Sequence, residues 1–339
     1  MGATVDTFDL GDVGLEAGAV LPGAKLAYRT YGQLNTAKDN VILNPTWFAG
    51  IGSENEWLFG PGRVLDTNRF FIVVPELLGN GVSSSPSNHP TLGCWEVFPQ
   101  VSIRDNVRLQ ARLLEEAFGV TRIRMAIGWS MGAQQVFEWG VLYPDSVQTI
   151  LALCGSAKTS PHNFVFLEGV KAALTVGTGR AIDRSDQATR QAALRAVGRV
   201  YAGWALSQAF YRKELWRDLG FASLEGFIVD FWEGLFAKKD VDDLMVLLRT
   251  WQQADVSSRA EHGGNLGQAL GGIKAKTIVM PCTTDLYFTL DDSEAEAALI
   301  PDARLRPIPS IFGHAAGVGL HQRDTEFVES AIAELLFQD

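Results

Sequence analysis

A glycine-flanked serine motif constrains the fold of this chain more than any other feature of its sequence. Residues 128–132 read Gly-Trp-Ser-Met-Gly, and they lie between an apolar run at 123–127 and a helix-forming run at 133–142. A strand–turn–helix setting is what a nucleophile elbow requires, because the serine occupies a strained turn. A side chain at either glycine would collide with the neighbouring strand or helix. The sequence therefore predicts Ser130 as a catalytic nucleophile.

Short apolar runs rich in β-branched residues alternate with helical patterns along most of the chain. Runs that are apolar almost throughout are typical of strands covered on both faces. The alternation predicts an α/β fold whose mostly parallel sheet is flanked by helices and joined by right-handed crossovers. The predicted strands span 40–44, 70–74, 123–127, 147–153, 276–280 and 303–308, and the predicted helices span 104–114, 133–143, 293–299 and 325–336.

This alternation is interrupted from about residue 160 to residue 266 by helical sequence that is rich in large aromatic side chains. We interpret this stretch as a helical insertion, or cap, over the carboxyl edge of the sheet. The predicted core comprises residues 1–160 and 266–339, and the predicted cap comprises 161–265. Most of the cap aromatics are expected to hold the cap together, and two or three to line a pocket. They are Trp204, Phe210, Tyr211, Trp216, Phe221, Phe227, Phe231, Trp232, Phe236 and Trp251.

The net charge of the chain limits its binding partners, and its cysteines indicate its cellular compartment. The chain has 39 acidic and 29 basic residues, a formal net charge of −10, which argues against nucleic acid or an anionic membrane as a partner. No apolar stretch reaches the length of a membrane span, and residues 1–6 do not begin a signal peptide. Cys94, Cys154 and Cys282 are scattered and lack a zinc-site spacing. We therefore expect reduced thiols in a cytoplasmic protein, with Cys154 and Cys282 packed in the core.

A serine nucleophile needs a base, and the chain offers five histidines. His314 follows the last predicted strand and precedes the final helix, where the base falls in the chain order Ser, Asp, His. Asp285 directly follows the preceding predicted strand, whereas Asp291 and Asp292 resemble a helix N-cap. The predicted triad is therefore Ser130, Asp285 and His314, in which the carboxylate orients the imidazole. The other histidines lie in proline-containing loops (His89 and His162), in a polar stretch at the end of the cap (His262) and in a helical region beyond the sheet (His321).

Acyl transfer also needs two backbone N–H groups that face the oxygen of the tetrahedral intermediate. One should come from Met131, the residue after the nucleophile. The second should come from the loop at 44–50, where we choose Phe48, with Trp47 as the alternative. The side chains of Trp47, Phe48 and Trp129 would then help to enclose a small apolar acyl site, although simple core packing fits each of them nearly as well.

The chain resembles the homoserine O-acetyltransferase-like branch of the α/β-hydrolase superfamily in two neighbouring segments. They are residues 128–139, Gly-Trp-Ser-Met-Gly-Ala-Gln-Gln-Val-Phe-Glu-Trp, and the Tyr-Pro-Asp turn at 143–145. Further similarity lies at 26–32, 75–81 and 242–255. The resemblance covers nearly the whole chain. It implies an α/β-hydrolase fold with the triad given above, a cytoplasmic location, and a homodimer in which the helical caps meet.

Three departures from that branch bear on the substrate. Acetyltransferases of the family carry an aspartate after the catalytic histidine, where this chain has Ala315, and a Tyr-Arg element in the cap that grips an amino-acid carboxylate. The corresponding stretch at 205–211 has no arginine before Arg212, and Trp129 replaces the usual glycine of the elbow. A buried zwitterionic acceptor would be left unpaired, which costs roughly several kcal/mol. An apolar alcohol fits better, as in the esterase members of the branch.

These observations predict a serine carboxylic ester hydrolase that cleaves short acyl esters, acetates foremost, through an acyl-enzyme on Ser130. We expect no metal and no organic cofactor, because nucleophile, base and electrostatic stabilisation all come from the chain. The alternative is an acetyl-CoA-dependent O-acetyltransferase that acts on homoserine or a similar hydroxyl acceptor. A ligand-binding protein on the same fold is disfavoured by an intact triad.

Overall fold

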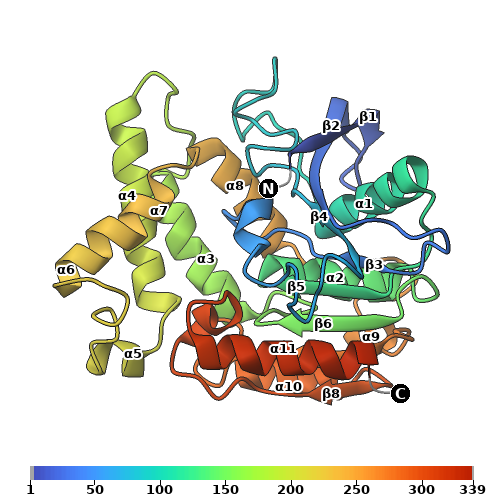
Figure 1. Ribbon diagram of the computed structural model, residues 1–339. Coiled ribbons are helices and arrows are strands. Elements are labelled where there is room, and N and C mark those ends of the chain that lie inside the picture. The colour runs from blue at the N-terminus through green and yellow to red at the C-terminus, as the bar shows by residue number, and fades with distance from the viewer. Residues whose placement is uncertain (1–3, 338–339) are drawn as a thin grey trace.

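A mostly parallel sheet of eight strands forms the centre of the computed structural model, which describes residues 4–337 (Figure 1). The strand order is β1-β2-β4-β3-β5-β6-β7-β8, and only the β1–β2 and β2–β4 pairs are antiparallel. The α/β fold class predicted from the sequence is therefore confirmed. The strands are β1 (Asp6–Gly14), β2 (Val20–Tyr31), β3 (Val41–Leu43), β4 (Phe71–Pro75), β5 (Met125–Trp129), β6 (Thr149–Leu153), β7 (Lys276–Met280) and β8 (Ala303–Leu305).

The central strands form where the sequence is apolar at successive positions, and every residue of β3, β4 and β6 is buried. The predicted strand at 123–127 is displaced: β5 begins at Met125 and continues through Trp129, while Ile123 makes only an isolated bridge with Val147. Gly128 and Trp129 thus belong to the strand, and the turn is confined to Ser130. The last predicted strand was also too long, since β8 ends at Leu305.

The antiparallel hairpin of β1 and β2 was not among the predicted strands. Its residues alternate between exposed and buried positions and are interrupted by polar residues and glycine, so no continuous apolar run marks it. Register shifts between Asp9 and Gly11 and between Gly11 and Val13 also break the period-two pattern. The hairpin extends the sheet beyond β4 (Figure 1).

Helices cover the sheet, and α2 packs on β5 and β6 while α11 packs on β6 and β7. The core helices are η1 (Gly52–Asn55), α1 (Ile103–Phe118), α2 (Met131–Leu142), α9 (Leu266–Leu270), α10 (Leu290–Ala297), η3 (Gly313–Gly317) and α11 (Gln322–Phe337). The N-cap of α10 is Thr289, whose side chain accepts the N–H of Asp292. Asp291 and Asp292 lie inside the first turn, so the prediction that they form the N-cap was wrong. His321 precedes α11 and does not lie within a helix.

The chain between β6 and α9 forms a group of helices on one side of the sheet, toward the left of Figure 1. They are α3 (Pro161–Leu174), α4 (Gln187–Trp204), α5 (Gln208–Arg212), α6 (Leu224–Gly226), the π-helix η2 (Phe227–Glu233), α7 (Gly234–Phe236) and α8 (Val241–Gln252). At its base Lys158 pairs with Asp255 in an antiparallel bridge and an ion pair of 2.8 Å. We propose, as the sequence suggested, that 161–265 is the cap and that 1–160 and 266–339 form the core. Within residues 4–337, no helix combines the length and apolar character needed to cross a membrane.

A glycine allows two cap helices to approach each other closely. A Cβ added at Gly198 of α4 would lie 2.6 Å from the carbonyl oxygen of Trp232 in η2 and 2.9 Å from the Cα of Glu233. These neighbours are backbone atoms, which cannot rotate away as a side chain can. The absence of a side chain at Gly198 therefore sets the distance between α4 and the π-helix that carries part of the cavity wall described below.

Gly198→Ala tests this packing. We expect it to lower the free energy of unfolding by about 1–3 kcal/mol, as overpacked interiors do, measured by urea denaturation. Gly203→Ala is the matched control on the same helix, because nothing lies within 4 Å of its added Cβ. That control should be neutral or stabilise the protein by up to about 1 kcal/mol through helix propensity. Equal stability of the two variants would contradict the close approach.

Candidate active site

Ser130 lies in a strained turn between β5 and α2, with φ 58° and ψ −124°. The two glycines of the motif make this turn possible. A Cβ at Gly128 would lie 2.2 Å from the carbonyl carbon and oxygen of Gly132, and a Cβ at Gly132 would lie 2.8 Å from the carbonyl oxygen of Pro45. The serine is buried at the first turn of α2, where the helix dipole favours developing negative charge. This geometry is that of a nucleophile elbow.

Asp285 and His314, which are 29 residues apart in sequence, meet in the structure: Nδ1 of the histidine lies 2.7 Å from Oδ2 of the aspartate. Both side chains are almost fully buried. The other oxygen, Oδ1, accepts the N–H groups of Tyr287 and Phe288 at 3.1 Å each, which fixes the carboxylate. Thr284 links the two loops, since its hydroxyl donates to the Ser310 carbonyl and accepts the Gly313 N–H. The predicted acid and base thus form a rigid pair.

The outer nitrogen of the imidazole, Nε2, is buried and has no hydrogen-bond partner among residues 4–337. His314 and Ser130 line the same cavity. A buried polar atom without a partner is costly, so this nitrogen is available for a proton from a reacting group in the cavity. The structure thus brings all three predicted triad residues to one site.

Trp129 does more than enclose the pocket, which is the role that the sequence suggested for it. Its indole Nε1 donates a hydrogen bond of 3.0 Å to the backbone carbonyl of His314, and the two rings are 4.5 Å apart. On the other side Tyr287 packs against the imidazole at 4.5 Å, and Phe288 stacks at 5.5 Å. These three rings hold the imidazole in one orientation. No signal in the sequence identifies this contact, because it joins residues far apart in the chain.

The two predicted oxyanion donors are both buried next to the serine. Met131 begins α2, and Phe48 lies in the loop after β3 and contributes to the cavity wall. Neither backbone N–H donates to another residue within 4–337. Gln135 fixes the loop, because its amide donates to the Thr46 carbonyl at 2.8 Å. Trp47 lies against Trp129, with ring centroids 5.0 Å apart, and also lines the cavity.

The cavity above Ser130 has a volume of about 260 Å³ and mostly apolar walls from both the core and the cap. Ala315 and Leu206 line it, and Arg212 is exposed and does not line it. Within residues 4–337, no group of three or more His, Cys, Asp and Glu side chains is arranged to bind a metal ion. Four of the ten cap aromatics named from the sequence line the cavity rather than the two or three expected: Phe227, Phe231, Trp232 and Phe236. Tyr201, which was not among the ten, also lines it.

Comparison with known proteins agrees with this geometry. Residues 39–310 match the family model described as the alpha/beta hydrolase fold. The chain belongs to the α/β-hydrolase family. An ethyl acetate hydrolase from Pseudomonas veronii is 37% identical over 334 residues, with 98% of this chain and 95% of that protein covered. A homoserine O-acetyltransferase from Chlorobaculum tepidum is 30% identical over 94% of this chain and 91% of its own length.

Comparison with solved structures also finds esterases among the similar proteins. The acetyl esterase MekB is 37% identical and superimposes with a TM-score of 0.92 over 98% of this chain and 96% of its own. The resemblance to the homoserine O-acetyltransferase-like branch, and within it to its esterases, is thereby confirmed. For this α/β-hydrolase, the higher identity lies with the esterases rather than with the acetyltransferase.

The loop that carries Phe48 is held by a buried carboxylate, that of Glu76, which has no distinguishing mark in the sequence. Oε1 of Glu76, at the end of β4, accepts the N–H of Gly52 at 2.8 Å. Asn80 donates to Oε2 of the same carboxylate at 2.8 Å and reaches the Gly50 carbonyl at 3.5 Å. Burial raises the pKa of Glu76 to about 7, against the opposing effect of these hydrogen bonds and of Arg29. The motif at 75–81 thus fixes the position of the loop at 44–50, which carries Phe48.

The pH dependence of stability in Glu76→Gln tests whether burial raises the pKa of this carboxyl. Because the folded carboxyl has a pKa of about 7 rather than the ordinary 4.5, the stability it contributes is complete below pH 4.5 and is lost as the pH rises through about 7. The free energy of unfolding of the variant should therefore fall less steeply from about pH 5 to pH 7, by up to about 1.4 kcal/mol per pH unit. Urea denaturation at several pH values measures this slope.

Glu116→Gln is the control for that measurement. Glu116 is exposed, and a hydrogen bond from Arg112 lowers the pKa of its carboxyl, so its titration falls below the window used. The slope of this variant should match that of the wild type. A Glu76→Gln slope that also matches the wild type would contradict the raised pKa.

Asp285→Asn tests the coupling of the acid to the base. An amide cannot stabilise an imidazolium as a carboxylate does, so phosphorylation of Ser130 by an organophosphate should slow by about 10³- to 10⁴-fold. Intact-protein mass spectrometry follows the modification. Asp291→Asn, an exposed change in the first turn of α10, should react at the wild-type rate. Equal reaction rates for the two variants would exclude Asp285 from the triad.

Proposed function

We propose that this chain is a serine carboxylic ester hydrolase that cleaves short-chain acetyl esters through an acyl-enzyme on Ser130. The observation that carries the proposal is the Asp285–His314 pair, whose free Nε2 shares an apolar cavity with the elbow serine. The similarity to an ethyl acetate hydrolase and to the acetyl esterase MekB supports the choice of substrate.

In the acylation step, the Ser130 hydroxyl oxygen attacks the ester carbonyl while Nε2 of His314 takes its proton. Asp285 stabilises the resulting imidazolium through Nδ1 and keeps the carboxylate charge itself. The N–H groups of Met131 and Phe48 hold the oxyanion. When the intermediate collapses, the bond to the alkoxy group breaks, and His314 returns the proton to the departing alcohol.

In the deacylation step, water attacks the acetyl-enzyme as the same histidine removes one of its protons. The second tetrahedral intermediate expels the Ser130 oxygen, which takes the proton back from Nε2 and releases acetic acid. Nucleophile, base and oxyanion donors all come from the chain, so the proposal includes no cofactor. The substrate is a small-molecule ester, and no nucleic acid or membrane takes part.

An O-acetyltransferase is the second candidate, because a homoserine O-acetyltransferase is 30% identical over most of the chain. Its chemistry is the same up to the acetyl-enzyme, and only the acceptor differs. Ala315 and Leu206 oppose it, since neither can pair with the charges of an amino-acid acceptor. Water, which needs no such partners, is the acceptor that this cavity favours.

We further propose a cytoplasmic homodimer that is formed through the caps. The free thiols of Cys94, Cys154 and Cys282 suit a reducing compartment. Exposed apolar side chains on the cap, among them Phe164 and Val165 of α3, offer a surface that a second copy would cover.

The proposal is tested by hydrolysis of ethyl acetate, followed by acid release, with and without homoserine and acetyl-CoA. We expect a rate that homoserine does not change and a loss of about 10⁴-fold or more in Ser130→Ala, because the acyl-enzyme cannot form. An unchanged circular dichroism spectrum of the variant serves as the folding control. Consumption of acetyl-CoA that depends on homoserine would instead establish the acetyltransferase.

A further inference from the structure

The cavity above Ser130 is lined by one carboxylate and by no lysine or arginine. Among the described residues that line it, Glu54 is the one acidic side chain and His314 the one basic side chain. His314 is committed to Asp285 and to proton transfer. Glu54 is therefore the one fixed charge that a substrate meets in this cavity. Neither the proton transfers nor the oxyanion donors described above make use of it.

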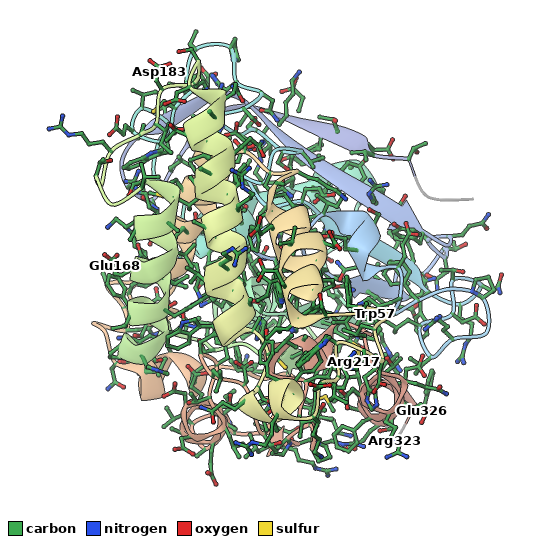
Figure 2. The ribbon with its side chains drawn as sticks, turned by 90° about the vertical axis from the view of Figure 1, so that its left-hand side faces the viewer. Trp57, Glu168, Asp183, Arg217, Arg323 and Glu326 are labelled. Atoms are coloured by element: carbon green, nitrogen blue, oxygen red, sulfur yellow. The ribbon has the colours of Figure 1, made fainter. Side chains whose placement is uncertain are left out.

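Glu54 lies at the mouth of the cavity, in the short helix η1 that follows the loop at 44–50. Its side chain is exposed, whereas Ser130 and His314 are buried, so it marks the end of the cavity that opens to solvent. Figure 1 shows this part of the chain between the sheet and the cap, and in Figure 2 the nearby Trp57 is labelled on the side that also carries Arg217 of the cap. A substrate entering between core and cap passes this carboxylate.

The position of the carboxylate is fixed locally. Oε2 of Glu54 accepts the N–H of Ile51 at 2.8 Å, at the start of η1. No ion pair within 4.0 Å joins Glu54 to any cationic side chain in the range 4–337. The buried Glu76 lies near enough that the charge of Glu54 adds to the raised pKa of that carboxyl. The nearby Arg29 lies 3.9 Å from Glu76, so the Glu54 carboxylate keeps its charge without a direct ion pair.

Aromatic rings form nearly half of the residues that line the cavity, including Trp129 from the core and Tyr201 and Trp232 from the cap. The face of an aromatic ring attracts a cation within about 6 Å through its quadrupole, most strongly for tryptophan. A carboxylate on a ligand would gain nothing from these rings and would lose its water without finding a cationic partner. The aromatic walls and the carboxylate at the mouth therefore both favour a cationic ligand over an anionic one.

We propose that Glu54 sets the charge selectivity of the ester cavity, so that acetate esters of cationic alcohols, with an amine or quaternary ammonium group, are favoured over esters that carry a carboxylate. This inference rests on the proposed ester hydrolysis and names the class of its leaving alcohol. The acyl group sits at Ser130 and the oxyanion donors. The alcohol portion extends toward the cap and the mouth, where Glu54 and the aromatic faces meet its charged group.

The test compares three acetate esters of similar size in wild type and Glu54→Gln. One is acetylcholine, the second is the neutral ester in which carbon replaces the nitrogen of choline, and the third is the acetate ester of γ-hydroxybutyrate. Glutamine keeps an oxygen that can accept the Ile51 N–H and removes only the charge. The ratio of kcat/KM for the cationic ester to that for the neutral ester should fall by about threefold in the variant at low ionic strength. The ratio for the anionic ester to the neutral ester should rise by a similar factor. Both changes should shrink at about 0.5 M salt, where charges are screened within a few ångströms.

Glu56→Gln is the matched control, because it removes the same charge from a nearby exposed residue that bonds Tyr31 and does not line the cavity. The proposal expects its ratios to equal those of the wild type. Equal shifts in both variants would assign the effect to the overall charge of the protein and overturn the proposal, as would unchanged ratios in Glu54→Gln. If wild type hydrolyses none of the three esters, nor ethyl acetate, it is the proposed function that fails.

Discussion

The close approach of α2 to β5 determines the geometry on which the rest of the site depends. Because Gly128 and Gly132 have no side chains, the helix begins directly against the strand and the loop at Pro45. Ser130 is then held at φ 58°, a conformation that the surrounding packing must maintain. The same approach places the start of α2 against the loop that carries Phe48. The strained serine at the N-terminus of α2 is thus a consequence of this steric contact.

Much of this arrangement could be predicted from the sequence because it depends on local sterics and on chain order. Apolar runs marked the parallel strands, and carboxyl ends of parallel strands meet at one edge of the sheet, so residues following them come together. The predicted residues Asp285 and His314 follow β7 and β8, and their side chains meet in the structure. The same reasoning failed for β1 and β2, whose half-exposed strands with bulges lack a continuous apolar pattern. The prediction for β5 was displaced by two residues, since Gly128 and Trp129 resembled part of the turn.

The missed contacts share a physical cause: they join a buried polar atom to a backbone group far away in sequence. Trp129 donates to the His314 carbonyl, and Glu76 accepts from Gly52. A carboxylate of Glu296 likewise accepts the N–H groups of Ala157 and Lys158 at the base of the cap, and burial raises its pKa to about 8. Composition gives no sign of such partners. Each of these side chains satisfies loop N–H or C=O groups that no strand or helix could satisfy.

The acceptor of the acetyl group is decided by what the cavity can solvate rather than by the triad. A zwitterionic amino acid brings a carboxylate and an ammonium group, and each needs a partner once water is excluded. Ala315 and Leu206 offer none, and Glu54 at the mouth repels the carboxylate. Water makes no such demand, because it is small and needs only the base that already serves the first step. The proposed triad of Ser130, Asp285 and His314 would therefore support hydrolysis, while transfer to an amino acid would require charged partners beside the serine that Ala315 and Leu206 do not supply.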